Sequence, residues 1–413
     1  MLLNLGHQNK IMKHYKIILT LIFIILFFNG NTKELKEGYW KGKLNLQEDK
    51  ILTFIFSVDK NQRITIQNAQ ERILLKESIN KNDSLQYYFS SFPNFLIFQV
   101  KSEKQVSGFF INPDRKKEYS KIEFNAEYFG IKEPKNRGNN KKEVDGKWQV
   151  SFDPDTEHNF PAIGIFKHNR NTVTGTFLTE TGDFRFLSGK FKNNFLTISS
   201  FDGAHVFLFT ATLKNDTLKG DFLSGSHYKT NWKGFKNDDF ELENPDSLTY
   251  MVKDEFSFNF KTVEGKKYAY PNEELKNKVV IVQIMGTWCP NCLDETVFYK
   301  ELYKDYNELG LEIIAIAYES PESFEDKVKR IIRFSENKEV NYPILVGGNA
   351  SKNESSKDFA MLNNISSFPT SIFINKEGKV IKIHTGFNGP GTGEIYTNYK
   401  KRTKILIERL LKE

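Results

Sequence analysis

The segment spanning residues 279–295 constrains the fold of this chain more than any other. It opens with the apolar run Val279–Met285, whose valines and isoleucines predict a buried β-strand. Gly286 ends the run, and Cys289-Pro290-Asn291-Cys292 then begins a pattern of apolar residues at helical spacing that continues to Leu309. The sequence therefore predicts a buried strand that leads two thiols to the start of a helix.

The position of the two cysteines predicts their chemistry. Free backbone N–H groups and the positive end of the dipole at a helix N-terminus stabilise a thiolate, so we expect Cys289 to be the nucleophile. A separation of three residues across the first helical turn brings two Cα atoms within the roughly 4.4–6.8 Å that a disulfide tolerates. Cys292 can therefore act as the resolving thiol and close a redox-active Cys289–Cys292 disulfide.

A family resemblance rests on this segment and on a second one. The buried strand, the Trp288-Cys-x-x-Cys motif, the helix and a later Phe368-Pro369-Thr370 followed by a strand resemble the TlpA/ResA type of thioredoxin-fold thiol-disulfide oxidoreductase, a bacterial extracytoplasmic family. The resemblance covers about residues 254–413. It implies a mixed sheet flanked by helices and a cis peptide bond at Pro369. It also implies substrate contacts from four residues, which are Trp288, Phe368, Pro369 and Thr370.

The resemblance also suggests a proton-handling role for one carboxylate. Glu295 lies three residues after the second cysteine, where the family has a glutamate with this role. Two features depart from the family pattern. Leu293 stands where a basic residue is common, and the Pro290-Asn291 dipeptide differs from that of thioredoxin itself. Both departures bear on the reduction potential rather than on the fold.

Other interpretations of these residues stay open at this point. A Cys-x-x-Cys pair can be half of a zinc site, but the chain has no further cysteine and His384 could supply one ligand at most. Haem attachment requires a histidine where Leu293 stands. The cysteine pair could be an inert structural disulfide. Glu295 could be present only because the helix dipole favours acidic residues in the first turn, and Pro369 could be an ordinary loop proline. We expect no metal and no cofactor.

The N-terminal residues predict a targeting segment. Lys10, Lys13 and Lys16 precede residues 17–28, an apolar run of the length that secretion signals use. Because a spanning helix needs roughly 18 to 20 apolar residues, residues 1–31 are interpreted as a cleaved signal peptide in preference to a permanent anchor. No cysteine lies near the end of the run, which excludes a lipoprotein anchor. The sequence thus predicts an extracytoplasmic location, in the periplasm or cell envelope.

Composition supports a redox role in that compartment. The 413 residues contain two cysteines, both in the Cys-x-x-Cys motif, so an exported chain would have no structural disulfide to confuse with its site. The net charge of +7 is spread along the chain rather than gathered in a stripe, which favours solvated surface over nucleic-acid binding. The remaining histidines that we considered lack ligand spacing: His158, His168, His205 and His227.

The region before the redox segment predicts two related all-β modules. Short alternating or aromatic-rich runs are separated by Asn, Asp, Gly and Lys turns, without helical periodicity. Gly38-x-Trp40 recurs as Gly146-x-Trp148, and further matches follow at nearly the same offset, which indicates an internal repeat. We expect antiparallel modules at residues 36–132 and 145–236, each a meander, a sandwich or a barrel, with a lipocalin-like fold as one option. The sequence does not state their function.

The last domain, residues 254–413, should alternate strands and helices. Strands are expected at 256–260, 279–285, 311–318, 342–346, 371–374 and 379–386, and helices from Cys292 to 309 and at 323–337, 357–364 and 394–411.

Three functional hypotheses follow. The first is an extracytoplasmic thiol-disulfide oxidoreductase, a reductase in preference to an oxidase. Its partners would be exported disulfide-containing proteins and a membrane electron donor, with a membrane tether through the N-terminal segment as an option. The second is a peroxiredoxin-like thiol peroxidase, because Thr287 lies near the nucleophile, although two residues away rather than the usual three. The third is a non-enzymatic binding protein that acts through its β modules.

Overall fold

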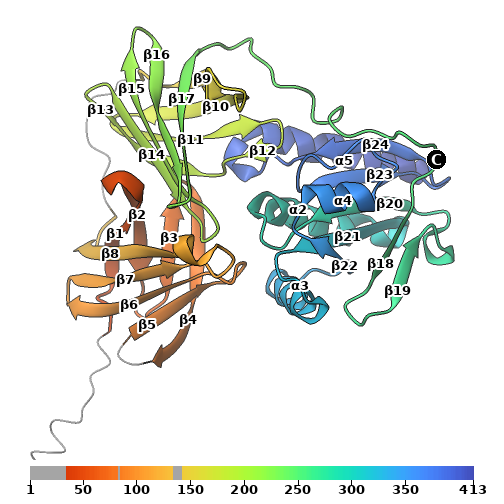
Figure 1. The fold of residues 1–413 in the computed structure, drawn as a ribbon, viewed down its shortest axis with the longest axis horizontal. Helices are drawn as coiled ribbons and strands as arrows, with labels where there is room; N and C mark the ends of the chain where they lie inside the picture. The colour runs from red at the N-terminus through yellow and green to blue at the C-terminus, as the bar shows by residue number, and fades with distance from the viewer. Residues whose placement is uncertain (1–33, 82–83, 134–141) are drawn as a thin grey trace, which may run out of the picture.

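The structure is a computed structural model that describes residues 34–81, 84–133 and 142–413. Its chain forms two β-barrels and one α/β domain (Figure 1). The predicted targeting segment, residues 1–31, lies outside the described residues. Within those three described ranges, no helix combines the length and the apolar character that a membrane crossing requires.

The first module is a closed antiparallel barrel in which each strand pairs with the next and β8 returns to β1. Alternation of buried and exposed side chains explains the strands, because residues at every second position of β1 and β2 point into the barrel. Aromatic side chains such as Trp40, Phe56 and Phe98 fill the interior. The strands are β1 Gly38–Asn45, β2 Ile51–Val58, β3 Ile64–Asn68, β4 Glu71–Lys81, β5 Ser84–Phe89, β6 Phe95–Ser102, β7 Gln105–Ile111 and β8 Lys121–Gly130.

The second module repeats this architecture. Its sheet closes because β10 pairs with both β9 and β11, and β17 pairs with β9. The short strand β12 pairs with β11 as an addition to the ring. Its strands are β9 Gly146–Phe152, β10 Phe160–Asn169, β11 Thr172–Thr179, β12 Gly182–Asp183, β13 Leu187–Lys192, β14 Phe195–Phe201, β15 Val206–Lys214, β16 Thr217–Ser224 and β17 Tyr228–Lys236.

The repeat read from the sequence is also present in the geometry. Trp40 and Trp148 lie at the same place in the first strand of each barrel. Each buried indole Nε1 donates to a carbonyl four residues earlier, at 2.9 Å from Lys36 O and 3.0 Å from Val144 O respectively. The preceding glycines, Gly38 and Gly146, both have positive φ, at 130° and 108°. The two modules are therefore copies of one barrel. Of the three architectures expected, the meander, the sandwich and the barrel, the structure shows the barrel.

The C-terminal domain is built on a mixed sheet with the strand order β19-β18-β22-β21-β20-β23-β24. The fully buried β20 pairs in parallel with β21 and antiparallel with β23. Helices α2 to α5 pack against the sheet (Figure 1). The strands are β18 Phe258–Lys261, β19 Lys267–Tyr270, β20 Val279–Met285, β21 Leu311–Glu319, β22 Ile344–Asn349, β23 Thr370–Ile374 and β24 Val380–Thr385. The helices are α2 Pro290–Tyr306, α3 Phe324–Lys338, α4 Lys352–Asp358 and α5 Glu394–Lys412.

One predicted helix is misplaced. The helix expected at 357–364 is wrong in position, because α4 begins five residues earlier, after Ser351, and ends at Asp358. Ser351 Oγ accepts from the backbone N of Glu354 at 3.3 Å, which is the N-cap contact that starts the helix. Phe359 and Leu362 follow the helix and are buried in the core. This apolar pair therefore anchors a turn rather than a helix.

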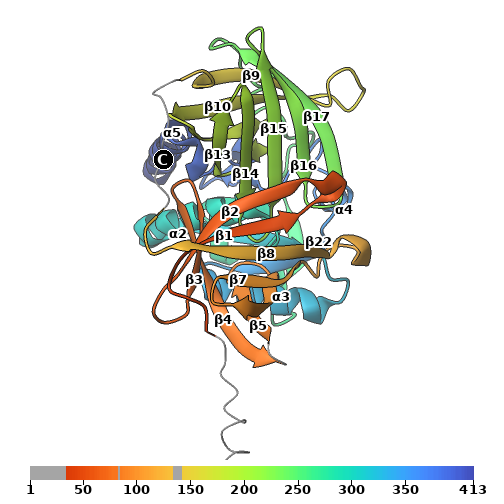
Figure 2. The same ribbon diagram turned by 90° about the vertical axis from the view of Figure 1, so that its left-hand side faces the viewer.

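All three domains touch one another. Figure 2 shows the second barrel above the first, with both in front of the α/β domain. The first module lies against α3, where Arg330 pairs with Asp114 and Arg333 donates to Phe92 O at 2.7 Å. The second module lies at the start of α2 and at the loop after β24. The cysteine motif, which opens α2, is therefore next to the second module.

Candidate active site

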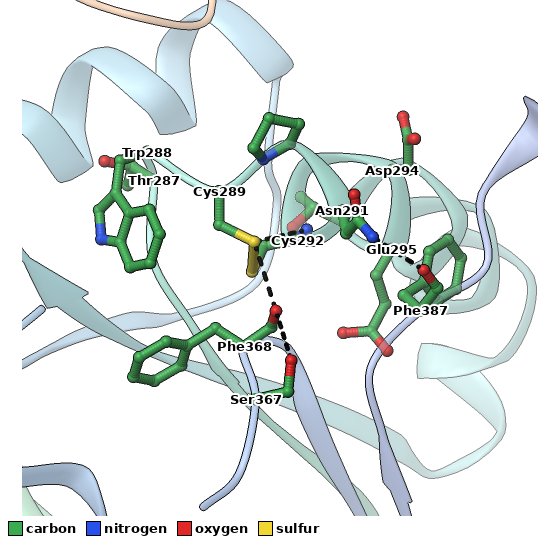
Figure 3. Close-up of a disulfide and its surroundings, with 12 residues drawn as sticks. Thr287, Trp288, Cys289, Asn291, Cys292, Asp294, Glu295, Ser367, Phe368 and Phe387 are labelled. Carbon is green, nitrogen blue, oxygen red and sulfur yellow. Dashed lines mark hydrogen bonds between the residues drawn. A yellow bond between two sulfur atoms is a disulfide. The ribbon is translucent and has the colours of Figure 1, made fainter. Parts of the chain in front are cut away.

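The two cysteines lie at the start of helix α2, just after the buried strand β20. Cys289 is the N-cap of α2, and its Sγ accepts from the backbone N of Cys292 at 3.2 Å. Cys289 and Cys292 are joined by a disulfide with a Cα–Cα distance of 5.2 Å (Figure 3). Cys289 is 6% exposed and Cys292 is fully buried. Only Cys289 can therefore be approached by a substrate, as its predicted role as nucleophile requires.

The loop before β23 lies against the sulfur of Cys289. Phe368 O is 3.5 Å from Cys289 Sγ, and Ser367 Oγ donates to the same carbonyl at 3.2 Å (Figure 3). The Phe368–Pro369 peptide bond is cis, which confirms that prediction. The backbone of residues 367–369 thus forms one wall of the site.

The four residues expected to contact a substrate are not equally placed. The half-buried Trp288 ring meets the Phe368 ring edge-on, with 5.8 Å between centroids, and Trp288 Nε1 donates to Tyr318 O at 2.8 Å. Phe368 is 9% exposed, and Pro369 is buried. Thr370 is fully buried, and its hydroxyl donates to Ser367 O at 2.8 Å. Trp288 and Phe368 border the sulfur, whereas the Thr370 side chain is out of reach of a substrate here.

Glu295 lies beneath the disulfide on the first turns of α2. It is fully buried and accepts from Gln283 Nε2 at 2.9 Å and from Ser371 Oγ at 3.0 Å. Burial raises the pKa of Glu295 to about 7, against which these two hydrogen bonds act. A carboxyl group with this pKa can take up and release a proton near neutral pH.

A second buried carboxylate supports the turn before Cys289. Glu319, the last residue of β21, accepts from Thr287 N at 2.8 Å and from Thr287 Oγ1 at 2.7 Å. Burial raises the pKa of Glu319 to about 7. Sequence reasoning missed this residue, although a glutamate ending an otherwise apolar strand was a signal. The Thr287 hydroxyl donates its hydrogen to Glu319 and therefore does not donate it to Cys289. The peroxidase hypothesis requires a threonine that acts at the nucleophile.

The residues between the two cysteines are held by the second module and by the loop after β24. Asn291 Nδ2 donates to Asp183 O and to Phe387 O, each at 3.1 Å, and Arg185 Nη1 donates to Pro290 O at 3.1 Å. Sequence reasoning found neither Asp183 nor Arg185. No local pattern could have found them, because they lie more than a hundred positions from the motif.

The histidine considered as a single zinc ligand has another role. His384 Nδ1 lies 2.6 Å from Asp246 Oδ1, so it ties β24 to the linker between the second module and the last domain. Among the residues that the structure describes, no three or more His, Cys, Asp or Glu side chains gather as a metal site would require.

Known proteins resemble the C-terminal part of this chain. The profile of the Redoxin family matches residues 251–399. Thiol-disulfide oxidoreductase ResA of Bacillus cereus is 30% identical over 183 residues, which cover 44% of this chain and 90% of that protein. ResA of Halalkalibacterium halodurans is 29% identical over 140 residues, covering 34% of this chain and 71% of that protein.

Solved structures also resemble this part of the chain. StoA from Bacillus subtilis aligns at 22% identity with a TM-score of 0.26, over 36% of this chain and 96% of that one. A thiol-disulfide oxidoreductase from Bacteroides fragilis aligns at 17% identity with a TM-score of 0.27, over 36% of this chain and 99% of that one.

Proposed function

Because this chain belongs to the ResA-type thiol-disulfide oxidoreductases, we propose that it is an extracytoplasmic reductase of disulfides in exported proteins. The observation that carries the proposal is the Cys289–Cys292 disulfide at the N-terminus of α2, beside the Phe368 carbonyl and above the buried Glu295. Each part of that arrangement has a task in disulfide exchange.

The first step is attack on the substrate. In the reduced protein the Cys289 thiolate attacks one sulfur of a substrate disulfide, the substrate S–S bond breaks, and the other substrate sulfur leaves as a thiolate that takes a proton from solvent. Cys289 and the substrate are then joined by a mixed disulfide. The helix N-terminus favours the thiolate, and the Trp288 and Phe368 rings flank the approach to its sulfur.

The second step releases the product. Cys292 gives up its proton and attacks Cys289 Sγ, the mixed disulfide breaks, and the substrate leaves with its second thiol. Because Cys292 has no exposure to solvent, its proton needs a buried acceptor. Glu295, on the same helix and with a pKa near 7, is the acceptor that we assign. Two electrons have then passed from the protein to the substrate, and the protein is left as the disulfide.

A cycle requires a source of electrons. We assign this role to a membrane-linked dithiol donor that reduces the Cys289–Cys292 disulfide by the reverse exchange. The basic and apolar residues 10–28 support export of the chain, with the same segment as a tether if it is not removed.

Cysteine variants test the proposal with insulin as the disulfide substrate. The reduced wild-type protein should reduce insulin repeatedly when dithiothreitol supplies electrons. Cys292→Ser should stop at a mixed disulfide with insulin, visible as an adduct that dithiothreitol removes. Cys289→Ser is the matched control and should form no adduct, because the remaining thiol is buried. An adduct through Cys289→Ser, or turnover by both variants, would refute the assigned roles.

The same variants separate the other hypotheses. A thiol peroxidase would still consume one equivalent of hydrogen peroxide as Cys292→Ser, without forming an insulin adduct. A pure binding protein would show neither reaction, and its behaviour would not change in either cysteine variant.

A further inference from the structure

Arg185 connects all three domains at the cysteine motif. It lies in the connection from β12 to β13, and its side chain is only 7% exposed. One guanidinium nitrogen, Nη1, donates to Pro290 O at 3.1 Å and pairs with Asp294, both on the first turns of α2. The other, Nη2, pairs with Glu71 of the first module, and Nε lies 3.2 Å from Asp202 of the second.

The loop that carries Arg185 fits closely against the motif. Thr181 O accepts from Ser367 Oγ at 3.2 Å, next to the cis peptide bond. Asp183 accepts from Asn291 through its carbonyl and from Gly389 N through its side chain at 2.7 Å. Gly182 has φ 137°, and a Cβ there would clash with Asn291 Nδ2 and lie 2.9 Å from Phe387 O. The loop has no room for a side chain at this point.

The charges around the motif are unbalanced. One guanidinium pairs with three carboxylates, Glu71, Asp202 and Asp294, each with a side chain no more than 12% exposed. The buried Asp183, whose Oδ2 accepts from the backbone N of Arg185 at 2.8 Å, is a fourth carboxyl group in this cluster. His205 also lies against Asp202, and Lys338 acts on Asp294 at longer range. Burial raises the pKa of both Glu71 and Asp294. Arg185 is therefore the cation that offsets carboxylates gathered at the start of the helix that carries Cys289.

We propose that Arg185 is a positioning residue of the redox reaction, through which the second module sets the reduction potential of the Cys289–Cys292 pair. It holds the Pro290 carbonyl and supplies positive charge on the first turn of the helix, and both act on the sulfur through the motif rather than by contact. This inference goes beyond disulfide reduction as such, since it assigns to a β module a property of the dithiol. The inference rests on the proposed function only in requiring that the Cys289–Cys292 pair cycles between dithiol and disulfide. It does not depend on the direction of electron flow.

The sign of the effect follows from the charge on the thiolate. The reduced pair carries a thiolate that the disulfide lacks, so positive charge near Cys289 stabilises the reduced state and raises the reduction potential. Loss of Arg185 should lower the potential and make Cys289 ionise at higher pH. Loss of a facing carboxylate should do the opposite.

The first test compares two charge-changing variants of the full chain. After equilibration in graded glutathione buffers and thiol alkylation, Arg185→Met should shift the equilibrium about tenfold towards the disulfide, or about 30 mV for this two-electron couple. Glu71→Gln, which removes a carboxylate on the first module, should shift the equilibrium by a smaller factor towards the dithiol. A residue that only holds the fold together would not give shifts of opposite sign. Shifts of the same sign, or none, would overturn the proposal.

A second test keeps every charge and works even if Arg185→Met does not fold. Gly182→Ala places a methyl group against Asn291 and should displace the loop, moving the potential in the same direction as Arg185→Met. Gly146→Ala is the matched control, because Gly146 belongs to the same module, has φ 108° and has open space around a Cβ. Equal potentials in the two alanine variants would overturn the role of the loop.

The wild-type measurement separates this inference from the proposed function. A wild-type pair that does not cycle in glutathione would overturn both. If the wild-type pair cycles, and Arg185→Met, Glu71→Gln, Gly182→Ala and Gly146→Ala all keep its reduction potential, only the role of Arg185 and its loop would be overturned.

Discussion

The two β modules are copies of one barrel, yet they meet the redox domain in different ways. In the first module, residues 69–70 join the third strand, β3, to the fourth, β4. In the second, the corresponding connection runs from 180 to 186 and includes β12. The longer connection reaches the cysteine motif through Asp183 and Arg185, whereas the first module rests on α3.

This difference separates the parts that the two barrels share from the connection that reaches the cysteine motif. The shared parts, such as the buried Trp40 and Trp148, maintain each barrel. The part that differs is the one that contacts the two residues between the cysteines, Pro290 and Asn291. Glu71, at the start of β4, meets Arg185, so the corresponding connections of the two copies converge on one ion cluster. We therefore expect equivalent substitutions in the shared parts of the two barrels to have similar effects. Substitutions in the two connections should have different effects.

The largest expected effect comes from breaking the ion cluster. Arg185→Met removes the guanidinium that pairs with three buried carboxylates, and we expect it to lower the free energy of unfolding by about 3–5 kcal/mol at pH 7. Denaturant unfolding followed by tryptophan fluorescence measures this. Glu71→Gln should cost far less, because two carboxylates still face the arginine. If the two variants were equally unstable, the cluster would not depend on Arg185.

A change within the redox domain should act independently of both modules. The pKa of Glu295 is near 7 in the folded protein and about 4.5 ordinarily, so stability is lost as pH rises from 4.5 through 7. Glu295→Gln removes this loss. Between pH 4.5 and 8, the free energy of unfolding of the variant should therefore rise by roughly 3 kcal/mol relative to that of the wild type.

The same variant should change the kinetics of product release. If the ionised Glu295 accepts the proton of Cys292, the wild-type rate of resolving the mixed disulfide should rise with pH through about 7, and Glu295→Gln should be slow without that rise. Glu301→Gln, at a half-exposed site on the same helix, is the control. A wild-type pH profile in Glu295→Gln would rule out the assigned acceptor.

Matched tryptophan variants sharpen the comparison of the shared parts. Trp40→Phe and Trp148→Phe each remove an indole hydrogen bond and leave a small cavity, at a cost of about 2 kcal/mol. We expect the two costs to agree closely in thermal or denaturant unfolding. Costs that differ severalfold would mean that the two barrels are not supported in the same way.

The smallest effect is expected where the first module rests on α3. Asp114→Asn weakens a partly buried ion pair with Arg330 and should cost about 1 kcal/mol. The reduction potential should change much less than in Arg185→Met, because Asp114 does not touch the motif. A potential shift as large as that of Arg185→Met would remove the distinction between the two modules.

Local patterns in the sequence predicted the frame of the site. The apolar run before Gly286, the spacing of the two cysteines and the Phe368-Pro369 pair are short-range signals, and the structure brings them together. The repeated Gly-x-Trp also predicted the duplication, because it marks the same hydrogen bond in both barrels.

The remaining features depend on contacts that local patterns cannot show. Arg185 and Asp183 reach the motif only after the second module docks, which brings together residues more than a hundred positions apart. Glu319 depends on which strand lies beside β20. The predicted position of α4 was wrong because the Ser351 cap sets the start of the helix, and the buried Phe359 and Leu362 lie after its end.

The most direct test of the account is the reduction potential of the Cys289–Cys292 pair in the full chain. Equilibration in graded glutathione buffers followed by thiol alkylation gives the value. For a reductase we predict a potential near that of thioredoxin, about −270 mV. A potential near −120 mV would identify an oxidant and contradict the direction proposed here.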